Sequence, residues 1–219
     1  MTLPANHYRT LKRDLSLHEL LADGIVHALA LLAGVIAFPL LLFHALQTAG
    51  IGTFAALAVY AAGFFLMWGF SLAYNMTPPS ALKWLLRRFD HSMIYVMIAG
   101  TYTAVIPHLG TGWAWTLGLV VWTGAALGIV VKVALPGRYD RLAILAYVLL
   151  GWVGVIAIGP VSAALPAVSL WLLAAGGLTY VAGVAFYVWE RLRFQNAIWH
   201  LFVAVAAGLH FAAVAVAIA

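Results

Sequence analysis

The sequence contains no cysteine and few charged residues: of its 219 residues, 8% are charged and 66% are hydrophobic. The absence of cysteine excludes a disulfide framework, thiolate metal ligands and a cysteine nucleophile, so any chemistry depends on histidine, carboxylate, hydroxyl and amide groups. The scarcity of charge and a mean hydropathy of +1.05 exclude a soluble globule, in which about a quarter of the residues are charged. The chain is therefore predicted to be an integral membrane protein.

The charged residues are unequal in sign, with 11 Lys and Arg against 6 Asp and Glu and a formal net charge of +5. No basic cluster is interleaved with exposed aromatic residues, and this excludes nucleic acid as a partner. Residues 1–23 are too polar to supply the apolar core of a signal peptide, so we expect the first apolar segment to be retained as an anchor.

Proline, glycine and charged clusters divide the rest of the chain into apolar runs long enough to cross a bilayer as helices. The predicted spans lie near residues 24–47, 51–75, 91–107, 113–135, 141–159, 166–188 and 197–218. An amphipathic segment over 80–90 is predicted to form a short interfacial helix on the inner leaflet. The sequence thus predicts an all-α integral membrane protein, a single domain over 1–219 that forms a seven-transmembrane helix bundle.

The orientation follows from the basic residues, which accumulate in cytoplasmic loops. All of the Lys and Arg residues precede the first span or lie around the junctions between spans two and three, four and five, and six and seven. The alternate loops and the C-terminal end contain none. This pattern predicts a cytoplasmic N-terminus, a C-terminus outside and an odd number of spans.

Polar side chains gather at the inner ends of four predicted spans, where ionisable groups are costly in lipid. These are Glu19, Asp23 and His27 at the entry to span one, Ser71 and Asn75 at the end of span two, Asp90 and His91 at the start of span three, and Asn196 and His200 at the start of span seven. A single polar side chain of this kind more often only forms a hydrogen bond between helices, but the whole set predicts a functional site. His210 lies about 15 Å deeper, near mid-membrane, either lining a cavity or as a single satisfied histidine.

Four segments make the chain resemble a known family. They read SLAYN over 71–75, RFDHSMIYVMIAGTYT over 88–103, GW at 151–152, and NAIWH over 196–200 followed by His210 and Phe211. With these segments the chain is similar to the hemolysin III family, the bacterial branch of the progestin and adipoQ receptor (PAQR) superfamily. The resemblance implies a seven-helix fold with a cytoplasmic N-terminus, placed in the bacterial inner (cytoplasmic) membrane.

The resemblance also implies a zinc ion near the cytoplasmic face, held by three histidines and flanked by a serine and an aspartate. By position, Ser71 and Asp90 match the serine and the aspartate, and His200 matches one zinc ligand. The other two ligand positions are occupied by Asn75 and Asn196. Because an amide oxygen is a weaker ligand than an imidazole, we expect zinc to be bound weakly or not at all.

The entry to the first span departs from the family pattern as well. Leu20 stands where family members usually carry Glu and Asp23 where they carry Asn, and the neighbouring Glu19 is placed to supply the displaced carboxylate. His27 and His91 occupy positions that also carry histidine in ordinary members, so neither is interpreted as a replacement ligand. The added carboxylate leaves open a site that responds to protons or cations.

Three functions are compatible with these residues. The first is a lipid-binding sensor or membrane-homeostasis protein with a degenerate metal site, whose partners are membrane lipids or fatty acids. The alternative is a zinc-dependent, ceramidase-like hydrolase of lipid amides, with Asp90 as the general base and Ser71 beside a zinc-bound water. The third is the cytolysis that the family name implies, for which a bundle with no amphipathic pore-lining face is poorly suited.

Overall fold

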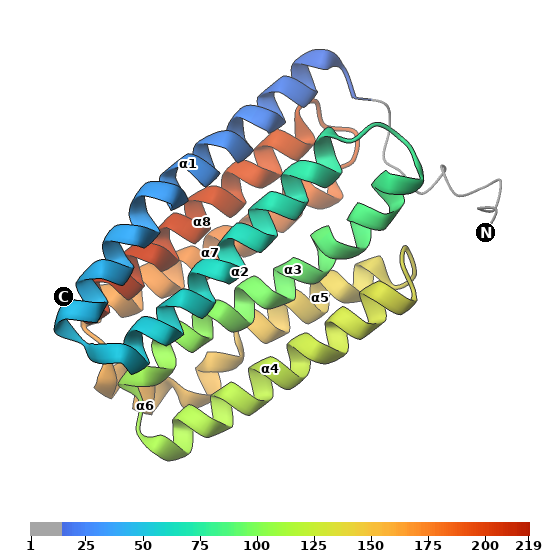
Figure 1. The fold of residues 1–219 in the computed structure, drawn as a ribbon. Helices are drawn as coiled ribbons and strands as arrows, with labels where there is room; N and C mark the ends of the chain where they lie inside the picture. The colour runs from blue at the N-terminus through green and yellow to red at the C-terminus, as the bar shows by residue number, and fades with distance from the viewer. Residues whose placement is uncertain (1–14) are drawn as a thin grey trace.

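The computed structural model describes residues 15–219, and every regular element in that range is a helix. The six long helices are α1 (Leu17–Thr48), α2 (Gly50–Met76), α3 (Ala81–Val105), α4 (Thr111–Ala134), α7 (Ala167–Val188) and α8 (Gln195–Ile218). A further rod is composed of α5 (Asp140–Gly151), the 3-10 turn η3 (Val153–Ala157) and α6 (Ile158–Ala164), and η2 (Ile106–His108) follows α3. Successive rods run in opposite directions (Figure 1), which makes an up-and-down bundle.

The helices are arranged as an open ring. In order around it, α4 packs on α3, α3 on α2, α2 on α1, α1 on α8 and α8 on α7. The bent rod that starts with α5 lies beside α3 and α4, and it meets α7 at only a few points. The contact between α5 and α7 is therefore a sparse seam in an otherwise closely packed bundle.

Among the described residues, six segments are long and apolar enough to cross a membrane: α1, α2, α4, Asp140–Ala164, α7 and α8. The third rod, α3, is not one of them because its first turns carry Lys83, Arg87, Arg88 and Asp90. The interfacial helix predicted over 80–90 and the span predicted from 91 form one continuous helix, α3. The fold is thus that of a multi-pass membrane protein.

The charged residues share one end of the bundle. The loops that join α2 to α3, α4 to α5 and α7 to α8 lie at the same end as the start of α1 (Figure 1), and the described Lys and Arg residues lie in or beside these loops. Arg9, Lys12 and Arg13, which also entered the prediction of orientation, lie outside the described residues. Among the described residues, the Lys and Arg side chains are therefore confined to one end of the bundle.

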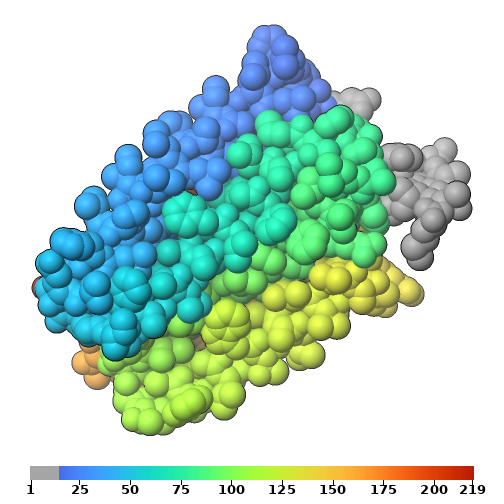
Figure 2. Space-filling view, viewed as in Figure 1, coloured from blue at the N-terminus to red at the C-terminus, as the bar shows by residue number. Residues whose placement is uncertain are grey.

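The outer surface is apolar along its length. Large hydrophobic side chains of α1 are more than half exposed, among them Leu29, Leu32 and Val35, and Trp171 on α7 is 77% exposed. Figure 2 shows the face on which α1 and α2 lie side by side from one end of the molecule to the other. A continuous apolar surface of this size is stable when lipid covers it.

Two glycines allow α2 and α3 to approach closely. A Cβ atom at Gly63 would lie 3.1 Å from the carbonyl oxygen of Val96, and one at Gly100 would lie 3.2 Å from the Cα of Tyr60. Small residues at a helix crossing let two backbones pack against each other in lipid. This contact fixes α3, and with it Asp90 and His91, against the helix that carries Ser71 and Asn75.

The span predicted near 141–159 is interrupted. α5 ends at Gly151, the 3-10 turn η3 follows it, and α6 begins at Ile158 with Pro160 in its first turn. The hydroxyl of Tyr102 on α3 donates to the carbonyl of Gly151 (2.7 Å) and accepts from the N–H of Gly154 (2.8 Å). Tyr102 thus satisfies backbone groups that the break would leave unpaired in lipid.

Candidate functional site

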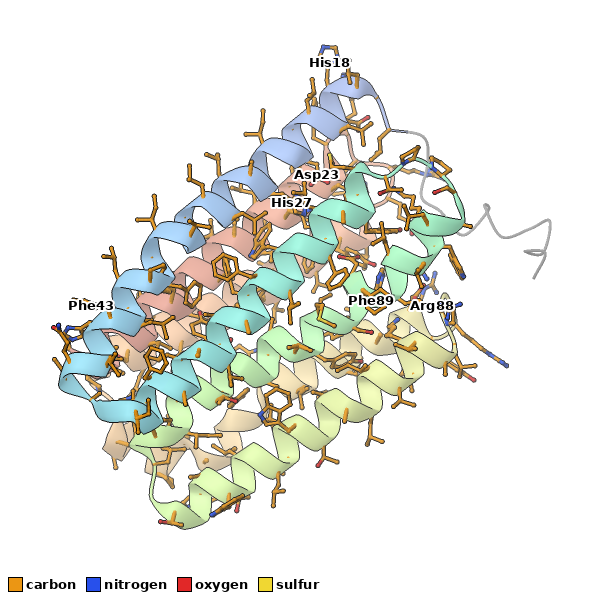
Figure 3. All side chains as sticks on the ribbon, in the orientation of Figure 1. His18, Asp23, His27, Phe43, Arg88 and Phe89 are labelled. Atoms are coloured by element: carbon orange, nitrogen blue, oxygen red, sulfur yellow. The ribbon has the colours of Figure 1, made fainter. Side chains whose placement is uncertain are left out.

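The predicted polar layer comes together where α1, α2 and α8 meet, near the charged end of the bundle. Asp23 and His27 lie on the side of α1 that faces the bundle, whereas His18 points away from it (Figure 3). Asp23 and His27 are fully buried, and Ser71 and His200 are buried as well. A helix brings residues four apart to one face, so α1 presents Asp23 and His27 together.

Asp23 contacts both histidine rings of the site. Its Oδ1 atom lies 2.6 Å from Nδ1 of His200, a residue of α8, the last helix of the chain. Its backbone carbonyl accepts a hydrogen bond from Nδ1 of His27 at 2.8 Å. A single residue therefore sets the orientation of both imidazoles.

The other nitrogens of the two rings converge on one hydroxyl. Nε2 of His27 lies 3.1 Å from Oγ of Ser71, and Nε2 of His200 lies 3.4 Å from the same atom. The two ring centroids are 4.3 Å apart. Ser71 is thus the centre of the cluster.

The two asparagines are bonded within this cluster. Asn75 donates from Nδ2 to the Ser71 hydroxyl (3.3 Å) and to the Ser71 carbonyl (2.9 Å), and Asn196 donates from Nδ2 to Oδ1 of Asn75 (3.3 Å). The chain therefore has a hydrogen-bonded amide pair where the resemblance implies two imidazole ligands. Together with the single imidazole of His200, this donor set does not fit the zinc site of the family.

Asp90 and His91 form the α3 part of the site. Oδ2 of Asp90 lies 3.3 Å from Nδ1 of His91, and that nitrogen also lies 2.9 Å from the carbonyl oxygen of Arg87. Asp90 lines the same cavity as Ser71 and His200. Its carboxylate therefore belongs to the same buried cluster, while His91 is directed toward its own helix.

Glu19 lies at the edge of the cluster and shapes the start of α8. It forms a capping box with Ser16 at the N-terminus of α1. Its Oε1 atom also accepts from the backbone N–H of Phe194 at 2.9 Å. Phe194 precedes α8 with a φ of 57°, so this bond supports the turn from which Asn196 and His200 extend.

A cavity of about 460 Å³ extends from the cluster into the bundle. Ser71, Asp90 and His200 line its polar end, and His210 and Tyr180 line it farther along. Nε2 of His210 lies 3.2 Å from the carbonyl oxygen of Leu173, and its ring centroid is 5.5 Å from that of Tyr180. His210 is thus both a cavity-lining residue and a hydrogen-bonded one, two alternatives that the sequence left open.

The sequence did not single out two groups beside the cluster. The buried Trp68 ring packs edge-on against His27, with 5.2 Å between the centroids, and nothing distinguishes it from other aromatic residues in an apolar helix. Asp140 accepts from Nζ of Lys132 (2.7 Å) and from Nη2 of Arg87 (2.5 Å). In the sequence, Asp140, Lys132 and Arg87 were noted only as charged residues at one end of the bundle, where they indicate membrane topology.

Within the described range, Asp23, His27 and His200 form the group of side chains most suited to a metal ion. Each offers one ligand atom, and these atoms lie within 4.8 Å of one another. A carboxylate with two imidazoles is a donor set found at zinc sites. Two of these three residues come from α1, on which the resemblance implies no zinc ligand.

The chain is similar to known proteins over most of its length. The family model described as Haemolysin-III related matches residues 15–211. Hemolysin-3 of Bacillus cereus is 36% identical over 187 residues, covering 84% of this chain and 85% of that protein. The Hemolysin-3 homolog of Bacillus subtilis (strain 168) is 33% identical over 190 residues, covering 86% and 89%.

A human protein also matches over a shorter region. The monocyte to macrophage differentiation factor of Homo sapiens is 30% identical over 127 residues, or 57% of this chain and 52% of that protein. The family model, which matches residues 15–211, extends through the α1, α2, α3 and α8 segments that build the site. This chain belongs to the hemolysin III family of multi-pass membrane proteins.

Proposed function

We propose that the protein binds the acyl chain of a membrane lipid or fatty acid inside the bundle and acts as a lipid sensor or membrane-homeostasis protein. The observation that carries this proposal is the cavity of about 460 Å³, which has polar groups at one end and apolar side chains beyond them. Small-molecule sites occupy about 300–1,000 Å³ and combine an apolar lining with a few polar groups. A lipid has the same division between a polar end and an apolar chain.

The length of the cavity suits an extended chain. On α3 its lining residues run from Lys83 to Tyr102, and the part from Asp90 to Tyr102 alone is a rise of about 18 Å along a helix. The polar end of the lipid would bind at Ser71 and its neighbours, and the chain would extend toward Tyr102.

The sparse seam between α5 and α7 supports entry from the bilayer. Both helices line the cavity, α5 with Tyr147 and Val148 and α7 with Tyr180 and Val184. Because the two helices contact each other at few points, few interactions have to be lost for an acyl chain to pass between them. Exposed apolar residues on both helices, such as Leu149 and Leu178, suit a seam that faces lipid.

We further propose seven membrane spans, with α3 as the additional one and the charged end in the cytoplasm. The alternating direction of the rods requires α3 to cross the bundle between α2 and α4 (Figure 1). The clustering of described Lys and Arg at one end favours a cytoplasmic location for that end, and hence a C-terminus outside, in the bacterial inner membrane.

Filling the cavity tests the lipid proposal. A Cβ atom at Gly177 would lie 3.1 Å from the Trp152 ring, at the wall of the cavity, whereas Gly208 has nothing within 4 Å and faces outward. Binding of a fluorescent fatty acid to purified protein is expected to weaken at least tenfold in Gly177→Leu and to stay unchanged in Gly208→Leu. Equal binding by both variants and the parent protein would exclude the cavity as the lipid site.

The alternative function is a zinc-dependent hydrolase of lipid amides, which the Asp23, His27 and His200 group favours. Its direct test is hydrolysis of a ceramide by protein supplied with zinc. Replacing the amides by imidazoles in an Asn75→His, Asn196→His variant is expected to raise zinc affinity by orders of magnitude, if these positions correspond to the family ligands. An unchanged affinity would show that they do not.

Cytolysis by pore formation has less support, because the polar residues lie at one end of the bundle.

A further inference from the structure

The cavity has a second polar site, formed by His210 and Tyr180, well beyond the cluster around Ser71. His210 follows His200 by ten residues on α8, so it lies about 15 Å farther along that helix. Between the two levels the lining includes the apolar side chains Met97, Val184 and Val203. The cavity therefore has polar groups at two depths, separated by a hydrocarbon-like stretch.

The His210 ring has one bonded nitrogen and one open nitrogen. Nε2 lies 3.2 Å from the carbonyl oxygen of Leu173, which only accepts, so Nε2 carries hydrogen and donates. A charged ring is costly at this depth in a membrane, and in a neutral ring the other nitrogen is an acceptor. Nδ1 has no hydrogen-bond partner among the described residues, and protein atoms do not enclose it. Because His210 lines the cavity, this acceptor opens into it.

The hydroxyl of Tyr180 is open in the same way. Tyr180 lines the cavity from α7, and its ring centroid lies 5.5 Å from that of His210. Its Oη atom has no hydrogen-bond partner in the described part of the chain and is not enclosed by protein atoms. Tyrosine hydroxyls away from water usually find a partner. Two neighbouring polar groups without one, deep in a membrane, therefore indicate a polar group on the ligand.

A glycine on α7 makes room for the histidine ring. A Cβ atom at Gly176 would overlap Cδ2 of His210 and would lie 2.6 Å from its Nε2, closer than side-chain atoms approach in proteins. Gly176 is buried, and Leu173, one turn earlier on α7, accepts the hydrogen bond of the ring. The contact between α7 and α8 thus holds the ring in place and sets the direction of Nδ1.

A hydroxyl is the group that satisfies both members of this site. It donates to the lone pair of His210 Nδ1 and accepts from the O–H of Tyr180. A ketone oxygen only accepts, so it leaves Nδ1 unpaired, and a methylene satisfies neither group. An extended hydrocarbon chain advances about 1.25 Å for each C–C bond of about 1.52 Å, so a separation of about 15 Å corresponds to about twelve bonds.

We propose that the cavity takes a hydroxylated acyl chain, whose hydroxyl lies about twelve carbons from its polar end and binds to His210 and Tyr180. The polar end then lies at Ser71 and the apolar stretch against the hydrocarbon part of the chain. This inference rests on the proposed function, since it names the class of lipid that the same cavity binds.

The test is the displacement of a bound fluorescent fatty acid from the purified full chain in detergent. The competitors are 12-hydroxystearic acid, 12-oxostearic acid, 2-hydroxystearic acid, which carries its hydroxyl at the polar end, and stearic acid. We expect 12-hydroxystearic acid to compete about tenfold better than the other three, because only its hydroxyl pairs with both groups.

Variants assign the preference to the two side chains. His210→Phe keeps a ring but removes the acceptor, and Tyr180→Phe removes only the hydroxyl. Each is expected to abolish the preference for 12-hydroxystearic acid, while stearic acid competes as it does with the parent protein. Tyr139→Phe, which changes an exposed tyrosine before α5, is the control and is expected to keep the preference.

The outcomes separate this inference from the function on which it rests. If the fluorescent fatty acid does not bind, the lipid proposal fails and the hydroxyl site fails with it. If it binds and 12-hydroxystearic and stearic acids displace it equally, lipid binding stands and the hydroxyl site is excluded. A preference that persists in both His210→Phe and Tyr180→Phe would also overturn the assignment. If His210→Phe does not fold, as judged by thermal unfolding, Tyr180→Phe decides alone.

Discussion

Asp23 and His200 are 177 positions apart in the chain, yet Oδ1 of one lies 2.6 Å from Nδ1 of the other, and this bond joins the first helix to the last. Both residues are buried. Hydrogen bonds to charged groups contribute about 1.5–3 kcal/mol to stability. The pair therefore contributes to both the site and the assembly of the bundle.

Removing this carboxylate is expected to loosen the contact between α1 and α8. Asp23→Ala leaves Nδ1 of His200 buried without its acceptor, so we expect a loss of about 1.5–3 kcal/mol in the free energy of unfolding. Thermal or denaturant unfolding in detergent measures this loss. Glu190→Ala, which removes an exposed carboxylate from the loop before α8, is the matched control and is expected to change stability by less than about 0.5 kcal/mol.

The close contact between α2 and α3 makes a second prediction. Gly63→Val places methyl groups against the backbone of Val96 and Met97, and overpacking of this kind costs about 1–3 kcal/mol. Gly69→Val, on the same helix but with nothing within 4 Å, is expected to cost far less. Equal melting temperatures for the two variants would show that the helices do not cross at Gly63.

The charged cluster around Asp140 gives a third prediction. Its carboxylate accepts from both Lys132 and Arg87, and Lys132 is buried. Asp140→Ala leaves these two cations close together without their acceptor, so it is expected to destabilise the protein by about 1.5–3 kcal/mol. Asp140→Asn, which keeps one acceptor oxygen, is expected to lose less. An effect of Asp140→Ala no larger than that of Glu190→Ala would mean that the cluster adds nothing to stability.

The orientation is testable because the chain has no cysteine of its own. Single cysteines at Glu190, in the loop before α8, and at Gly110, before α4, lie at opposite ends of the bundle, and both positions are exposed. In intact spheroplasts, a membrane-impermeant maleimide is expected to label Gly110→Cys and to label Glu190→Cys only after lysis. The reverse pattern would invert the proposed topology.

Much of the fold follows from the sequence, because lipid imposes a simple rule on composition. Apolar runs of about 20 residues predict helices, and the predicted segments correspond to rods of the bundle. The sequence did not reveal that α3 is one continuous helix, because its charged residues over 81–90 resemble a separate interfacial helix when considered alone. The interruption near Gly151 was missed because local apolarity says nothing of Tyr102, which satisfies the broken backbone from another helix.

The site was predictable in its members but not in its bonds. Helical spacing places Ser71 with Asn75, and Asp23 with His27, on common faces. It does not reveal that α1 and α8 are neighbours, so the pairing of Asp23 with His200 could not be predicted. It likewise does not reveal that both imidazoles contact one hydroxyl, because that depends on how α1, α2 and α8 pack together.

The open ring of helices has a mechanical consequence. Tyr102 fastens the bent rod to α3, while α7 is packed on α8, so the two sides of the α5–α7 seam belong to different parts of the ring. An acyl chain that entered through this seam would separate α5 from α7 and widen the protein in the plane of the membrane. Because tension in the bilayer favours a larger area, such entry would become easier in a stretched membrane.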